Sequence, residues 1–115
     1  MKVNSISGIT CYVEDLTRTA EFYETIGFRR GKEEADRLTF YVNWFFVTFI
    51  AGDRVEHPGS GVATYIKVDD VDDYYNAVVS EGLQPAGEPQ LRDGNREFVL
   101  RDPDGYTLVF FEKKK

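Results

Sequence analysis

The stretch that decides the fold is residues 95–112, which read NREFVLRDPDGYTLVFFE. Two runs rich in Val, Leu and Phe flank the tetrapeptide Asp102-Pro103-Asp104-Gly105. Proline presets φ at the second position of a turn, and glycine accepts a positive φ without a steric cost. We therefore predict a β-hairpin with strands near 95–101 and 106–112.

A second hairpin is predicted in the first half of the chain. Residues 37–42 and 44–50 are aromatic and β-branched, and Asn43 lies between them. A polar connector follows at 51–61, with Gly and Pro residues and the single histidine, His57. The connector is long enough to join two halves and to border a site. We expect His57 itself to be a solvated loop residue.

The two halves of the chain repeat one another. A strand at 6–13 precedes a helix capped by Asp15 or Thr17, and a strand at 62–68 precedes a helix capped by Asp70. A shift of 55 residues (15 to 70, 27 to 82) also superposes the glycines that end the two helices. Two unrelated strand–helix units would not reproduce cap and terminator in register. We predict an α+β fold of two tandem β-α-β-β-β modules.

This repeat defines the expected domain organisation and the expected site. Residues 1–115 form one domain, with module 1 at about 1–53, a connector at 54–61 and module 2 at about 62–115. Each four-stranded sheet must bury one face, and its helix covers only that face. If the two sheets pair edge to edge and curl, their other faces line a shared cleft, where small ligands usually bind.

Composition and charge narrow the function classes. The formal net charge is −6, and no basic stripe precedes the terminal lysines. This opposes binding to nucleic acids or anionic membranes and would attract a cationic ligand. One cysteine, Cys11, cannot form an internal disulfide, and the chain has no signal-peptide pattern or apolar run of membrane-spanning length. We expect a cytoplasmic protein.

Several short motifs together resemble one known superfamily over nearly the whole chain. They are YVEDL at 12–16, EFY at 21–23, IGF at 26–28, VDDV at 68–71 and DPDG at 102–105. These motifs are similar to those of the vicinal oxygen chelate superfamily, also called the glyoxalase/bleomycin-resistance/extradiol-dioxygenase superfamily. Residues 96–103 most resemble the bleomycin-resistance branch, whose small acidic dimers sequester cationic glycopeptide antibiotics without chemistry. The resemblance implies a homodimer.

The resemblance also implies where a metal would bind in the enzymes of the superfamily. The positions that carry ligands there are occupied here by Gly8, Ala63 and Val109, and the corresponding segment of the first half is 46–48. None of these side chains is an imidazole or a carboxylate, which divalent transition metals prefer. We therefore predict no metal, no cofactor and no catalytic residue. A displaced metal site that uses Glu112 or Cys11 is the alternative.

Aromatic side chains are the predicted contents of the cleft, although an aromatic stripe on a strand more often belongs to the core. The strand face that points inward is left open. No Ser–His–Asp arrangement or phosphate-binding loop is present. We predict a metal-free protein that sequesters a cationic or planar organic ligand. The alternatives are a metal-dependent glyoxalase- or dioxygenase-type lyase or oxygenase, and a domain kept only for its dimer surface. The expected ligand-binding residues are Trp44, Phe46, Tyr65, Phe98 and Phe111.

Overall fold

The computed structural model describes residues 1–52 and 62–113, so the predicted connector and His57 lie outside the described residues. The chain divides into two compact units, residues 1–56 and 57–115, which we call module 1 and module 2. No helix in the described part of the chain has both the length and the apolar character needed to cross a membrane.

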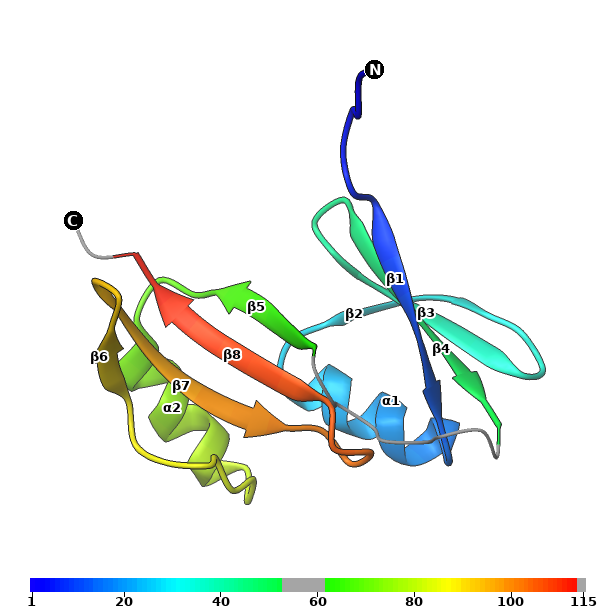
Figure 1. The fold of residues 1–115 in the computed structure, drawn as a ribbon. Coiled ribbons are helices and arrows are strands. Elements are labelled where there is room, and N and C mark those ends of the chain that lie inside the picture. The colour runs from blue at the N-terminus through cyan, green and yellow to red at the C-terminus, as the bar shows by residue number, and fades with distance from the viewer. Residues whose placement is uncertain (53–61, 114–115) are drawn as a thin grey trace. The chain divides into compact units, whose positions relative to one another are not determined.

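Module 1 is a four-stranded mixed sheet with one helix (Figure 1). The strand order is β1-β4-β3-β2, in which β1 runs parallel to β4 and the other neighbours are antiparallel. Its elements are β1 (Gly8–Val13), α1 (Leu16–Thr25), β2 (Arg29–Glu33), β3 (Arg37–Val42) and β4 (Phe45–Ala51).

Module 2 repeats this topology in the order β5-β8-β7-β6, and here β5 runs parallel to β8. The two helices have the same length and begin 55 residues apart, at 16 and 71, so the predicted repeat is confirmed. The elements are β5 (Ala63–Lys67), α2 (Val71–Ser80), β6 (Gln90–Arg92), β7 (Asn95–Arg101) and β8 (Thr107–Glu112).

Equivalent residues begin and end the two helices. Asp15 and Asp70 are the N-caps and share the same backbone angles, φ −137° and ψ 105°. The carboxylate of Asp15 accepts hydrogen bonds from two backbone amides of its helix, and that of Asp70 accepts one. Gly27 and Gly82 follow the helices with φ of 105° and 87°, a conformation that glycine adopts without strain. The sequence predictions for caps and terminators are confirmed.

The two predicted hairpins form; their first strands have the predicted bounds, and the second strand of each begins one residue later than expected. In the DPDG turn, the buried carboxylate of Asp102 accepts hydrogen bonds from the backbone amides of Asp104 and Tyr106, both at 2.9 Å. Gly105 supplies the positive φ of 91°. In the other turn, Asn43 takes a φ of 54°, which asparagine tolerates better than most residues. β8 therefore starts at Thr107 and β4 at Phe45.

In each module the helix covers one face of the sheet with aromatic side chains. In module 1, the ring of Tyr23 packs 4.5 Å from Phe49 and 6.2 Å from Phe40, and both phenylalanines are fully buried. In module 2, the ring of Tyr74 packs 4.8 Å from Phe110. Side chains of a strand alternate between its two faces, so these contacts identify the helix-covered face in both sheets.

Candidate functional site

The candidate site is built from the sheet faces opposite the helices, which we call the open faces. Paired residues on neighbouring strands point to the same side of a sheet, so the register assigns each side chain to a face. The open face of module 1 carries Gly8, Thr10, Tyr12, Arg37, Thr39, Tyr41, Phe46, Thr48 and Ile50. The open face of module 2 carries Ala63, Tyr65, Lys67, Gln90, Arg92, Asn95, Glu97, Val99, Arg101, Thr107, Val109 and Phe111.

Two of the predicted ligand-binding residues meet on the open face of module 2. The ring centroids of Tyr65 and Phe111 lie 6.0 Å apart at an interplanar angle of 67°. Tyr65 is 63% exposed, although it lies in the middle of β5. The exposed ring of Tyr65, with the half-buried ring of Phe111 edge-on beside it, offers an apolar face on which a planar ligand can stack.

A third predicted residue, Phe46, lies on the open face of module 1. Its register partners are Gly8 and Tyr41, and its ring lies 6.5 Å from that of Tyr41. A Cβ at Gly8 would collide with the Phe46 ring, and a Cβ at Gly31 would collide with the Tyr41 ring. Each glycine thus makes room for an aromatic ring from the adjacent strand. The open face of module 1 therefore carries two neighbouring aromatic rings, those of Tyr41 and Phe46.

Trp44 and Phe98 lie elsewhere. Trp44 occupies the β3–β4 turn, where it is 67% exposed and packs edge to face against Phe45. Phe98 lies on the helix-covered face, is 2% exposed and stacks on Phe110 at 5.1 Å. The structure therefore brings together Tyr65 with Phe111, and it separates Phe98 from them by the thickness of the sheet.

Sequence reasoning missed Tyr41 as a member of this surface. The signal was present, because a two-residue turn at Asn43 and Trp44 pairs Val42 with Phe45 and hence Tyr41 with Phe46. The charged residues Lys67 and Arg92 were also missed. They became visible only when the register placed them on the same face as Phe111.

The metal-ligand positions of the superfamily do not supply donors in this chain. Gly8 and Phe46 are cross-strand partners, and the phenylalanine ring occupies the space beside the glycine. In module 2, Ala63 pairs with Thr107, and Val109 is 4% exposed. Apolar side chains and a single hydroxyl do not form the set of imidazoles and carboxylates that a catalytic divalent metal needs. The residues present do not fit that metal.

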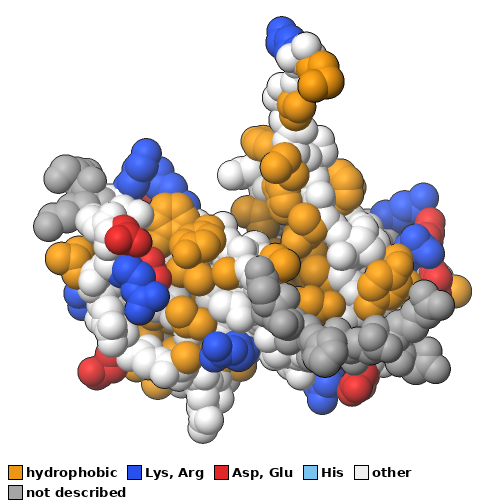
Figure 2. Space-filling model, viewed as in Figure 1, with side chains coloured by type: hydrophobic (Ala, Val, Ile, Leu, Met, Phe, Trp, Pro, Cys, Tyr) orange, Lys and Arg blue, Asp and Glu red, His pale blue; other side chains and the backbone are white. Residues whose placement is uncertain are grey.

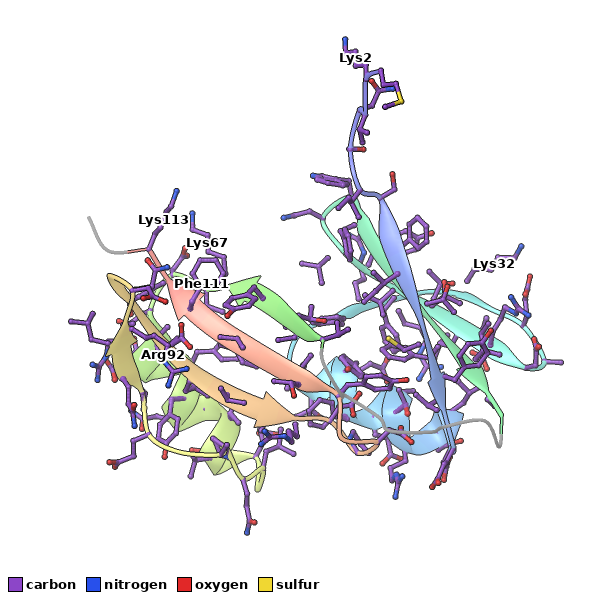
Figure 3. The ribbon with its side chains drawn as sticks, in the orientation of Figure 1. Lys2, Lys32, Lys67, Arg92, Phe111 and Lys113 are labelled. Carbon is purple, nitrogen blue, oxygen red and sulfur yellow. The ribbon has the colours of Figure 1, made fainter. Side chains whose placement is uncertain are left out.

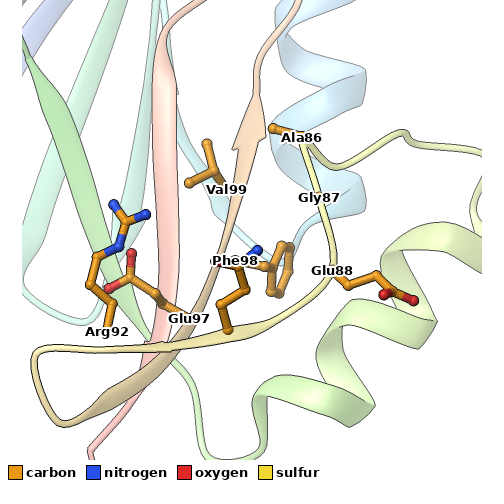
Figure 4. A pocket seen from close by; sticks show the side chains of 8 residues that line it. Ala86, Gly87, Glu88, Arg92, Glu97, Phe98 and Val99 are labelled. Atoms are coloured by element: carbon orange, nitrogen blue, oxygen red, sulfur yellow. The ribbon is translucent and has the colours of Figure 1, made fainter.

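A small pocket lies at the β6 side of module 2 (Figure 4). Its volume is about 190 Å³, which is below the roughly 300–1,000 Å³ of typical ligand pockets. The charged side chains of Arg92 and Glu97 line it together with Phe98. The full lining is Ala86, Gly87, Glu88, Gln90, Arg92, Glu97, Phe98 and Val99.

Acidic and basic side chains of module 2 are segregated between its two faces. On the helix side, Arg96 donates two hydrogen bonds of 2.9 Å to Asp72, and this contact holds the pKa of the Asp72 carboxyl below its usual value. The other charged residues of α2 and its two caps are acidic, namely Asp70, Asp73 and Glu81, and Glu112 of β8 lies on the same side. The open face carries three cations, Lys67, Arg92 and Arg101, against the single carboxylate of Glu97.

A protein-family model matches residues 5–110 and is described as Glyoxalase/Bleomycin resistance protein/Dioxygenase superfamily. The chain belongs to this superfamily. The match spans both modules, and the repeated βαβββ topology agrees with the vicinal oxygen chelate fold that the sequence motifs predicted. A comparison with curated proteins gave no match.

Solved structures of the same fold include members of more than one kind. A bleomycin resistance determinant encoded on transposon Tn5 is 22% identical, with a TM-score of 0.80 over 97% of this chain and 100% of that chain. An integron cassette protein from the mobile metagenome of V. cholerae is 22% identical, with a TM-score of 0.82 over 97% of both chains. A putative glyoxalase family protein from Bacillus anthracis is 16% identical, with a TM-score of 0.84 over 99% and 98%. At these identities the likeness establishes the fold.

Proposed function

We propose that the protein binds a small planar organic ligand on the aromatic open faces of its modules, without catalysing a reaction. The observation that carries this proposal is the Tyr65–Phe111 pair of module 2, in which Tyr65 is exposed and Phe111 is half-buried. The Phe46–Tyr41 pair of module 1 supports it, because it gives the second sheet an aromatic open face as well. The shared cleft between the modules remains a prediction.

The side chains at the superfamily's metal positions support a binding function over a metalloenzyme. Gly8, Ala63 and Val109 offer no lone pair to a metal. Under this proposal the protein resembles the bleomycin-resistance branch in mode of action, and its ligand is held by stacking and by charge.

The charge of the ligand is a separate question, because the net charge of −6 first suggested a cation. In module 2 the carboxylates gather on the helix side, and the open face carries more cations than carboxylates. The local charge near a ligand outweighs that of distant groups, since a Debye length is about 8 Å at physiological ionic strength. The charges of the open face thus favour a ligand of the opposite sign.

Titration calorimetry of chelator-treated protein tests the proposal. We would use two probes: metal-free bleomycin, which is a large cation, and 2-naphthalenemethanol, which is planar and neutral. We expect the naphthalene probe to bind and Tyr65→Ala to weaken it about three- to tenfold, the range expected for loss of one aromatic contact. Val79→Ala, which truncates an exposed side chain on α2, serves as the control. Binding of neither probe would contradict the proposal.

The competing function is an enzyme with a displaced metal site. Among the described residues, Asp70, Asp72 and Glu112 place carboxylate oxygens within 4.8 Å of one another. These oxygens already accept hydrogen bonds: Asp72 from Arg96, Glu112 from the backbone amide of Val71 and Asp70 from that of Asp73. The three carboxylates therefore stabilise the N-terminal turn of α2 and its contacts with the sheet. Stoichiometric metal in the protein as purified, retained after gel filtration, would favour the enzyme.

We also propose a cytoplasmic homodimer. Taken singly, each sheet ends in edge strands, and an edge strand exposes backbone groups that a partner can cover. The dimers of the bleomycin-resistance branch support the same expectation. Small-angle scattering at micromolar concentration should give a mass near twice the 13.2 kDa of the chain. A mass of one chain across the concentration range would contradict the dimer.

A further inference from the structure

We propose that the open face of module 2 takes a planar organic anion, an aromatic carboxylate in the simplest case. Its ring would rest on Tyr65 and Phe111, and its carboxylate would lie toward Lys67 and Arg92. This inference rests on the proposed binding function and names the chemical class of the ligand.

The first argument is the arrangement of charge around the aromatic pair. Lys67 is the direct cross-strand partner of Phe111, and both point to the open face. Lys113 follows Phe111 by two residues, and Figure 3 shows it at the same end of the sheet as Lys67. Arg92 projects from β6 on the same face. Three exposed cations therefore border one end of the aromatic surface.

The second argument is the scarcity of acids on this face. Glu97, which pairs with Phe111 from the other side, is the one carboxylate among the open-face strand residues of module 2. The acidic groups near the same strands, Glu112 and Asp72, belong to the helix-covered side. Figure 2 looks onto this face of module 2 and shows basic and some acidic side chains at the border of a hydrophobic patch. Among the open-face strand residues of module 2, the cations Lys67, Arg92 and Arg101 outnumber the single carboxylate of Glu97.

The third argument is that the cations can reach a common point. Neighbouring strands lie about 4.8 Å apart, so the Cα atoms of Lys67 and Arg92, three strands apart, are separated by roughly 14 Å or more. Lysine and arginine side chains extend over several methylene groups, and Lys113 follows β8, one of the two strands that lie between β5 and β6. A carboxylate held above the end of β8 is then within reach of more than one cation.

Protection of sheet edges is the simplest other role for these charges, since lysine on an edge strand discourages pairing with other chains. It accounts for Lys67 on β5 and Arg92 on β6. It does not account for Lys113, which follows the central strand β8, or for an aromatic side chain that is 63% exposed beside them. An anion-binding surface accounts for all of these features.

Three probes of equal shape and different charge test the inference. They are 2-naphthoate, 2-naphthalenemethanol and 2-naphthylmethylammonium, titrated into the full chain at pH 7 and low salt, with Kd read from NMR shift changes. We expect naphthoate to bind about fivefold or more tightly than the ammonium probe, and added salt to reduce the difference. Tighter binding of the ammonium probe would overturn the inference. Equal binding of all three probes would overturn it as well, while leaving the proposed binding function intact.

Charge-removing variants locate the effect. Lys67→Gln and Arg92→Gln should each weaken naphthoate about threefold and leave the neutral probe unchanged, as expected for an exposed ion pair. Lys32→Gln removes the same charge from β2 of module 1 and should leave naphthoate binding unchanged. If Lys32→Gln weakened naphthoate binding by the same factor, the effect would come from the net charge of the protein and not from this face. That result would overturn the inference. If no probe binds, the proposed function fails together with it.

Discussion

At the scale of single residues, the open face of module 1 depends on a missing side chain. Gly8 faces Phe46 across the β1–β4 pair, and the ring occupies the space that a Cβ would need. The absence of a side chain at residue 8 thus both removes a possible metal ligand and leaves room for the Phe46 ring. A metal-ligating side chain at residue 8 and the present position of the Phe46 ring are mutually exclusive.

We predict that Gly8→Ala lowers the free energy of unfolding by about 1–3 kcal/mol, because the new methyl group overpacks the pair. Urea denaturation followed by circular dichroism measures this change. Gly52→Ala is the matched control in the same module, since a Cβ there meets nothing within 4 Å. The control should differ from the parent protein by less than about 1 kcal/mol. Equal stability of the two variants would contradict the proposed packing.

At the scale of elements, the two helices repeat in sequence but differ in how their N-termini are held. Asp15 accepts two backbone hydrogen bonds, of 3.0 and 3.2 Å, at the start of α1. Asp70 accepts one, of 3.0 Å, at the start of α2, and Glu112 from β8 accepts the amide of Val71 at 2.8 Å. In module 2 the strand thus takes over part of the role of the cap.

We therefore expect Asp15→Ala to cost more than Asp70→Ala. Loss of an N-cap typically costs about 0.5–2 kcal/mol, and the first variant should lie at the upper end of that range. The second should lie at the lower end, because Glu112 still holds one amide and a nearby like charge is removed. Urea unfolding of both variants, with Asp15→Asn and Asp70→Asn as controls that retain the cap, measures the difference. A larger loss for Asp70→Ala would contradict this division of roles.

Tyr74 on helix α2 also makes the free energy of unfolding depend on pH in the alkaline range. Burial against the sheet raises the pKa of Tyr74 to about 12. The folded protein therefore keeps this proton at pH values where the unfolded chain, with an ordinary tyrosine pKa near 10, has lost it. The contribution to stability is complete below pH 10 and is lost as the pH rises toward 12. Tyr74→Phe should make unfolding less sensitive to pH in that window, measured by urea midpoints at pH 9 to 12. An unchanged slope would contradict the burial.

At the scale of the whole molecule, local sequence signals predicted most of the fold. Cap residues, helix-ending glycines and the DPDG turn act within a few residues of themselves, so Asp15, Gly27 and Asp102 could be placed without coordinates. The same signals recur after 55 residues (15 to 70), which gave the repeat. The family followed from the motifs and is confirmed by the model match over 5–110.

The site was less predictable because it depends on which strand face is covered. Both faces of β7 and β8 carry large apolar side chains. The alternation of apolar and polar residues therefore did not show which face of these strands the helix covers. Phe98 was grouped with Phe111 on the basis of residue type, and the register with Phe110 places it against α2 instead. Net charge is limited in a related way, since a sum over the chain does not say on which side of a sheet each charge lies.

The segregation of charge in module 2 gives this part of the molecule an electric dipole directed across the sheet. The negative end lies at α2, with Asp70, Asp73 and Glu81, and the positive end lies at Lys67 and Arg92. A positively charged support attracts such a body by its helix. An amine-coated sensor chip would therefore attract module 2 by its acidic helix side, and random chemical coupling would lose that orientation.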